Sequence, residues 1–202
     1  MRWTILLSLV LVWTGCRREE TAPPAAEPLA ARAAAEALAA CEVAADRGCV
    51  AEHLDLDAKA RYLFGPIFTE ADDVTRGATR AMLLDLFMAA GPALRRDHFD
   101  GGVGEWSVDS ADGAQALVTE AGKELHLEYR VVRATGGWRV TDRVRVRGEH
   151  RADPKVLVDK FLADFNKGSG RSATLADVNR DLPGFLGSHR ARTLRIPKKG
   201  HR

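Results

Sequence analysis

The chain has few aromatic residues, and it lacks the sequence motifs that usually accompany catalysis. Aromatics make up only 6% of its 202 residues, so a core must depend on aliphatic side chains and alanine. No Gly-x-Ser-x-Gly, His-Glu-x-x-His or glycine-rich phosphate-binding motif occurs, and no cysteine and histidine form a recognisable nucleophile–base pair. We therefore expect a protein that is not an enzyme and that has no cofactor.

A strongly basic folded surface is also missing. The formal net charge is only +2, and six basic residues with no acidic residue lie in the segment 182–202. The body of the chain before this tail is net acidic, whereas a nucleic-acid-binding domain carries positive charge on its folded surface. We therefore expect no nucleic-acid partner. The hydrophobic fraction of 46% and the charged fraction of 29% are typical of a globular protein, and the length fits one domain.

The longest apolar run stands at the N-terminus. Arg2 precedes the apolar segment 3–13, which is short for a membrane-spanning helix but fits the hydrophobic region of a secretory signal. The run ends in Gly15-Cys16, which resembles the bacterial lipoprotein box, where the cysteine is lipidated. We predict a signal peptide over 1–15, lipidation of Cys16, a flexible tether over 16–27 and a membrane-anchored lipoprotein that faces the periplasm. A plain signal peptide with a coincidental cysteine is the alternative.

Two cysteines remain once Cys16 is assigned to the lipid anchor. On one straight helix Cys41 and Cys49 would lie about 12 Å apart, which is too far for a disulfide. Asp46-Arg47-Gly48 stands between them and is typical of a helix end, so a chain reversal there can bring the sulfurs together. In an oxidising compartment we predict a Cys41–Cys49 disulfide rather than two buried thiols. The six histidines are scattered without cysteine or acidic partners at ligand spacing, so we expect no metal site.

The first half of the chain predicts helices. An alanine-rich helix is expected over 28–47, and a second over 50–64 that stops at Gly65-Pro66. A third begins at Thr69, an N-cap followed three residues later by an acid, and runs to about Ala90. The sequence Gly91-Pro92 is expected to close or kink this helix, and the amphipathic stretch 93–99 is a possible continuation of it.

After residue 102 the hydrophobic period changes to short alternating runs that are separated by turn residues. This pattern indicates a four-stranded antiparallel meander. The four runs are 103–109, 115–121, 124–133 and 138–147.

The chain ends in helices. Asp153 followed by proline is a helix start, and Thr174 begins another short helix that ends near Leu182. The expected fold class is α+β: N-terminal helices, a curved four-stranded antiparallel meander and C-terminal helices, together shaped like a cone. We expect a single domain over 28–182 and a basic tail over 183–202.

A twisted sheet wrapped around helices encloses an apolar interior, which is either a packed core or a pocket for an apolar ligand. The alternation of the last two strands assigns one face to this interior and the other to solvent. The expected lining of the pocket is Leu84, Phe87, Met88, Leu125, Leu127, Tyr129, Val131, Trp138, Val140, Asp142, Val144 and Val146.

A polar pair is expected inside this cone. A two-residue turn at Thr135-Gly136 places Tyr129 opposite Asp142. The pair can be an acid–base or headgroup-binding site, because a carboxylate in an apolar cavity has a raised pKa. Alternatively, Asp142 accepts hydrogen bonds from N–H groups and locks the sheet to a helix. We favour the second interpretation, because buried polar groups are usually satisfied by hydrogen bonds.

The same register pairs arginines of the last strand on the solvated face. Glu128 would face Arg143, and Glu124 would face Arg147. Arg139 and Arg145 remain, and they could meet a lipid phosphate or an acidic partner. An ordinary solvated face is the favoured interpretation of the arginine row.

Three segments in order resemble the MlaC family, the periplasmic phospholipid-binding component of a lipid-transport ABC system, also called the toluene-tolerance family. They are the acidic and apolar helix start at 54–65, the hairpin with Tyr129-Arg130 and Gly137-Trp138-x-x-x-Asp142, and Gly148 followed by the Phe161 helix and Gly168. The resemblance implies an apolar pocket for a phospholipid or another apolar ligand, with transporter subunits as possible partners.

The Gly-Trp-x-x-x-Asp ending is also similar to that of small NTF2-like domains, which share a cone-shaped sheet. This weaker resemblance implies a non-catalytic cell-envelope lipoprotein that binds protein partners or acts structurally. The sequence thus leaves two functions open, a lipid-binding auxiliary protein of a transport system and an interaction module.

Overall fold

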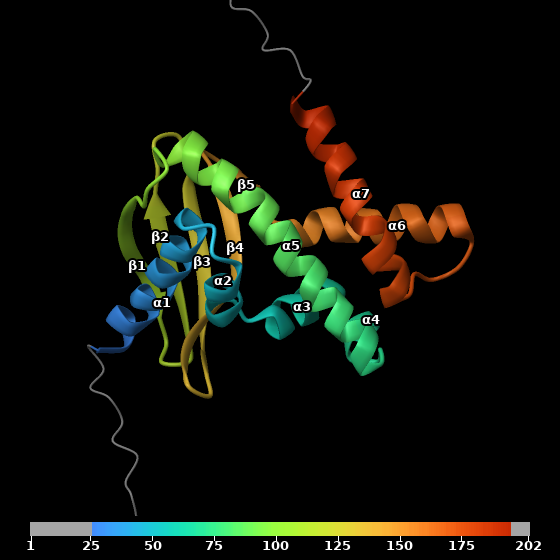
Figure 1. Cartoon of the computed structure of the whole chain (residues 1–202), viewed down its shortest axis with the longest axis horizontal. Coiled ribbons are helices and arrows are strands. Elements are labelled where there is room, and N and C mark those ends of the chain that lie inside the picture. Colours follow the sequence, from blue (N-terminus) through green and yellow to red (C-terminus); the bar gives the residue numbers. More distant parts are fainter. Residues whose placement is uncertain (1–25, 195–202) are drawn as a thin grey trace, which may run out of the picture.

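An antiparallel sheet with the strand order β1-β2-β3-β4-β5 forms one side of the molecule (Figure 1). This computed structural model describes residues 26–194, so the expected signal peptide, Cys16, most of the tether and the end of the basic tail lie outside the described residues. The α+β class is confirmed, but the expected count of four strands is wrong. The strands are β1 (Glu105–Ala111), β2 (Gln115–Ala121), β3 (His126–Ala134), β4 (Gly137–Arg147) and β5 (His150–Ala152). The last has three residues, which is too short to show an alternation in the sequence.

Helices precede and follow the sheet. They are α1 (Ala26–Val43), α2 (Arg47–His53), α3 (Leu56–Phe64), α4 (Pro66–Thr69), α5 (Asp73–His98), α6 (Pro154–Ser169) and α7 (Leu175–Leu194). Among residues 26–194, none of these helices combines the length and the apolar character that a membrane span needs.

The helix expected over 50–64 is divided into α2 and α3. Leu54 forms an isolated parallel bridge with Val140, and the Asp55 backbone N–H donates to the Val140 carbonyl at 2.8 Å. The Asp55 side chain then accepts from the Ala58 N–H at 2.8 Å and caps α3. The sheet therefore competes with helical hydrogen bonding at this point, and a short extended contact with β4 separates α2 from α3.

Three helix ends also differ from expectation. The N-cap of α5 is Asp72, which accepts from the Thr75 N–H at 2.8 Å, and not Thr69, which ends α4. The helix expected to reach about Ala90 is not closed at Gly91-Pro92; it continues to His98, over the stretch expected as a possible continuation. Similarly, α7 runs through Pro183 to Leu194, so its expected end near Leu182 is wrong and the expected start of the basic tail falls within a helix.

Two apolar clusters form the interior. In the first, α1 crosses the sheet and packs with α2 and the second half of α5 against β1 to β4. In the second, α3, α4, α6 and α7 pack around the first half of α5, at the side of the molecule away from α1 (Figure 1). The long helix α5 contributes to both, since neighbouring residues Leu83 and Leu84 belong to different clusters.

The register between β3 and β4 changes along the hairpin. Near the turn, Ala134 pairs with Gly137 and Val131 with Val140, as the two-residue turn predicts. Thr141 is then an extra residue, and beyond this β-bulge Arg130 pairs with Asp142. A shift of one residue moves every later side chain to the other face of the strand.

Candidate functional site

The predicted pocket residues divide into two groups. Seven belong to the apolar cluster between the sheet and the helices α1, α2 and α5: Leu84, Phe87, Leu125, Leu127, Tyr129, Val131 and Val140. Met88 and Trp138 are partly buried and pack against the same cluster. The bulge at Thr141 places the other three, Asp142, Val144 and Val146, on the opposite face of the sheet, so their assignment to the same lining is wrong.

The sheet face expected to line a pocket is covered by α1. Ala31, Ala35 and Leu38 of this helix are fully buried in the same cluster as the sheet residues. Alanine side chains allow the helix to lie close to the strands, so the sheet and α1 form a packed layer in this structure. Two surface hollows, of about 400 and 350 Å³, lie elsewhere, one between α5 and α7 and one beside the turn that joins β1 and β2.

A network of buried charges lies within this layer. Arg95 of α5 is 1% exposed, and it forms ion pairs with Glu42 of α1 and Glu120 of β2. Its Nη2 atom lies 3.2 Å from Glu42 Oε2 and donates to the Tyr129 hydroxyl at 2.6 Å. Tyr129 in turn donates to Glu120 Oε2 at 2.6 Å. Arg143 pairs with the second oxygen of Glu42.

The network is balanced in charge, with two guanidinium groups and two carboxylates. Burial alone would lower the pKa of Arg95, but the oxygens of Tyr129, Glu120 and Glu42 outweigh it and hold this pKa above its ordinary value. Burial raises the pKa of Tyr129, and Arg143 and Arg95 offset this only in part, so the hydroxyl keeps its proton and can donate it to Glu120. Removal of any one member would leave a buried charge or polar group without its partner, so the contact of α1, α5 and the sheet depends on the whole network.

Among the predicted pocket residues, only Tyr129 belongs to this network, although the sequence contains a signal for it. Arg95 follows Leu84, Phe87 and Gly91 at helical spacing, and Glu120 follows Ala116 and Val118 in strand alternation. Glu42 likewise continues the buried positions of α1. Charged residues of opposite sign at core positions of separate elements predict a shared buried network.

Asp142 lies on the other face of the sheet and has a different partner from the one expected. Its Oδ1 atom accepts from Lys59 Nζ of α3 at 2.6 Å, and its side chain is 2% exposed. Tyr129 pairs with Arg143 in the ladder, so the expected Tyr129–Asp142 pair is wrong. Asp142 joins the sheet to a helix, through an ammonium group rather than through backbone N–H groups.

The arginine row is only partly as expected. Arg147 does pair with Glu124, but Glu128 pairs with Arg151 of β5 instead of Arg143. Arg139 Nη2 donates to the Glu52 carbonyl at 2.7 Å. Arg145 is exposed, and it shares a face of the sheet with Arg143, because their partners in β3 are Leu127 and Tyr129.

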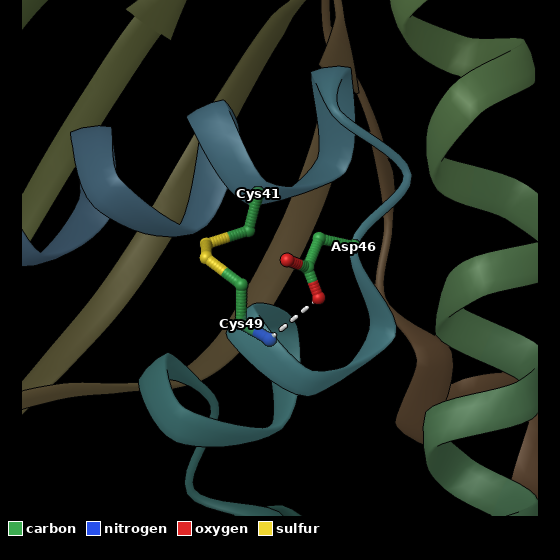
Figure 2. The surroundings of a disulfide bond; sticks show 3 residues. All are labelled: Cys41, Asp46 and Cys49. Carbon is green, nitrogen blue, oxygen red and sulfur yellow. Dashed lines mark hydrogen bonds between the residues drawn. A yellow bond between two sulfur atoms is a disulfide. The ribbon is translucent and has the colours of Figure 1, made fainter.

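The Cys41–Cys49 disulfide is present and joins α1 to α2 (Figure 2). The two Cα atoms lie 5.5 Å apart. The chain reverses earlier than predicted: α1 ends at Val43, Ala45 has a φ of 52°, and Asp46 caps α2 by accepting from the Cys49 N–H at 3.0 Å. The chain reversal predicted around Asp46 is thus present. It occurs at Ala45 and Asp46, whereas Gly48 lies within α2.

His53 lies beside this disulfide. One ring nitrogen of His53 and the sulfurs of Cys41 and Cys49 all lie within 4.8 Å of one another. The expectation that no histidine has a cysteine partner is therefore wrong. The signal was the spacing, because residues 49 and 53 are four apart and lie on one side of a helix.

Comparisons with known proteins match the fold and not the sequence. No protein-family model matches the chain, and no curated protein matches it. Among solved structures, the fold is similar to that of a phospholipid-binding protein from Ralstonia solanacearum that was determined in complex with a phospholipid. The TM-score is 0.51 at 13% sequence identity, over 80% of this chain and 97% of that chain. The two proteins therefore share a fold.

Proposed function

We propose that this chain is a non-catalytic, exported lipoprotein that binds a phospholipid or another apolar ligand as an auxiliary part of a lipid-transport system. The observation that carries the proposal is the similarity of fold to a phospholipid-binding protein along nearly all of that protein. The resemblance of the hairpin and of residues 54–65 to the MlaC family supports it independently, because it rests on sequence.

The ligand site proposed is the sheet face beneath α1. Helix α1 covers this face with small side chains, among them Ala31 and Ala35. Each methylene of an acyl chain that is buried contributes about 0.8 kcal/mol, so a lipid tail can replace the contacts that alanines make when α1 moves aside. Arg143 and Arg145 lie on this side of β4, where a guanidinium group can hold a phosphate by paired hydrogen bonds.

The proposed lipid anchor at Cys16 determines where the domain acts. Helix α1 begins at Ala26, so the tether before it has ten residues and spans at most about 35 Å when extended. The domain therefore stays near the membrane surface that faces the periplasm. It would then receive its ligand from that membrane or from transporter subunits within it. Replacing Cys16 with alanine tests this part, with release from the membrane fraction or stalled processing as the expected result. Unchanged fractionation and unchanged mature mass contradict it.

Native mass spectrometry of the full-length protein, purified in detergent and exchanged into a volatile buffer, tests ligand binding. The expected result is a non-covalent adduct with the mass of a phospholipid, in addition to the covalent lipid. Organic extraction of the same sample identifies the adduct. A protein that carries no adduct, even after incubation with vesicles, contradicts the proposal.

The coverage of the sheet face by α1 favours a second function, that of a structural or protein-binding module. The packing of α1 and the fully paired network of Arg95, Glu42, Glu120 and Arg143 are what a structural or protein-binding module of the NTF2-like type requires. In that case α1 never leaves the sheet. A variant with α1 cross-linked to β1 would then keep full function in cells, whereas a lipid carrier would lose it.

A further inference from the structure

We propose that Cys41, Cys49 and His53 form a binding site for a thiophilic metal ion such as Zn²⁺, and that the disulfide closes this site. The proposal is independent of lipid binding. It concerns the junction of α1 and α2, where the three side chains meet.

The geometry needs only small changes. In a tetrahedral zinc site, bond lengths of about 2.3 Å to sulfur and 2.0–2.1 Å to nitrogen place neighbouring ligand atoms roughly 3.5–3.8 Å apart. The three candidate atoms already lie within 4.8 Å of one another. Cys49 and His53 stand one turn apart on α2. Cys41 reaches Cys49 from α1 (Figure 2). Side-chain rotation at these positions is therefore enough once the sulfurs separate.

The surroundings favour a three-ligand site with one open position. Cys41 is buried in the apolar cluster beneath α1, whereas Cys49 and His53 are half-buried and lie nearer the surface. Two cysteines and one histidine are a known donor set for zinc with water in the fourth position. Asp46 lies beside the disulfide, but it is already bound to the Cys49 N–H, which fixes the start of α2.

Opening the site is a two-electron reduction. A dithiol reductant exchanges with the Cys41–Cys49 bond through a mixed disulfide, so that the reductant becomes a disulfide and both cysteines become thiols. Zn²⁺ then displaces the two thiol protons and accepts the lone pair of the neutral His53 ring, with release of two protons to solvent. Oxidation of the two thiolates by a second disulfide re-forms the bond and expels the ion.

Metal binding would keep the link between α1 and α2. A sulfur–metal–sulfur bridge replaces the sulfur–sulfur bond, so the position of α1 over the sheet is held in both redox states. The reduced chain without metal lacks this link and should be the least stable of the three forms.

The test uses the full chain in detergent, oxidised or reduced and freed of reductant without air. Competition with a chromophoric chelator measures Zn²⁺, and Co²⁺ reports thiolate ligands by its charge-transfer absorption. We expect one ion per reduced chain and none per oxidised chain. His53→Ala should weaken Zn²⁺ binding by about 100-fold or more, because loss of an outer-shell partner alone weakens metal binding by about 10- to 100-fold. Cys49→Ser should lose Zn²⁺ binding entirely.

The matched control is His98→Ala, at the half-buried last residue of α5, which should leave binding unchanged. Circular dichroism follows the fold in parallel. If the reduced chain unfolds, Zn²⁺ should restore its helical signal. The proposal is overturned if the reduced chain binds Zn²⁺ no better than the oxidised chain, or if His53→Ala binds as tightly as the unchanged protein.

Discussion

Gly91 of α5 lies so close to Glu42 of α1 that a Cβ atom at position 91 would overlap the carboxylate. The glycine is therefore needed in the middle of a long helix, because it leaves room for the carboxylate that Arg95 and Arg143 share.

Replacing Gly91 with alanine should displace Glu42 and break its buried pairs. Breaking such a pair costs about 3–5 kcal/mol, and the better helix propensity of alanine returns about 1 kcal/mol. We expect a net loss of about 2–4 kcal/mol in the free energy of unfolding, measured with urea. The control is Gly77→Ala in the same helix, where a Cβ meets nothing within 4 Å and stability should rise slightly. Equal effects at the two positions contradict the assignment.

The buried pair of Lys59 and Asp142 predicts a non-additive response. Lys59→Met leaves a buried carboxylate without its cation and should destabilise the protein by about 3–5 kcal/mol. Adding Asp142→Leu removes that charge and should recover most of the loss, because an apolar pair of similar size is often neutral. Urea unfolding of the two single variants and the double variant gives the coupling energy. Additive losses would show that the two side chains do not depend on each other.

Asp177, near the start of α7, predicts a contribution to stability that depends on pH. Hydrogen bonds from Arg171, and then from the Thr174 backbone and hydroxyl, hold the pKa of this carboxyl well below its usual range. A pKa that is lower in the folded state stabilises the fold above the unfolded pKa of about 4, and this contribution is lost as the pH falls below it. Asp177→Asn should therefore be less stable than the unchanged protein at pH 7, and the difference should narrow in acid. Urea midpoints between pH 7 and pH 3 measure it, and a constant difference contradicts the prediction.

A larger side chain on either face of β4 should show whether that face borders a ligand-binding space or a packed core. Val140→Trp adds volume beneath α1, whereas Val144→Trp adds it on the opposite face. Overpacking of a tight core costs about 1–3 kcal/mol, and we expect that loss at Val144. If lipid binds beneath α1, only Val140→Trp abolishes the lipid adduct in native mass spectrometry. Retention of the adduct in Val140→Trp places any ligand elsewhere.

The sequence was sufficient for the meander, the disulfide and the first part of the hairpin register. The prediction of which β4 side chains share a face was wrong beyond Val140, for a physical reason. The even-numbered residues from Val140 to Val146 are all buried, which suggests one apolar face. In fact both faces of this strand are covered, one by α1 and the other on the side of α3, so the alternation conceals the bulge at Thr141.

The rest of the candidate site depends on contacts between distant segments. Glu42, Arg95 and Glu120 come from three elements, and no single one of those elements predicts a partner for its charge. The break between α2 and α3 was hidden for the same reason, because Leu54 and Asp55 leave the helix to contact Val140, far along the chain.

Helix α5 buries Leu84 and Phe87 in one apolar cluster and Met82 and Leu83 in the other. The helix thus packs into both apolar clusters. We therefore expect that unfolding of either cluster also unfolds α5, and with it the other cluster. Denaturation should accordingly be all-or-none, with the near-ultraviolet signal of Trp106 in β1 and that of Phe161 in α6 disappearing at the same denaturant concentration.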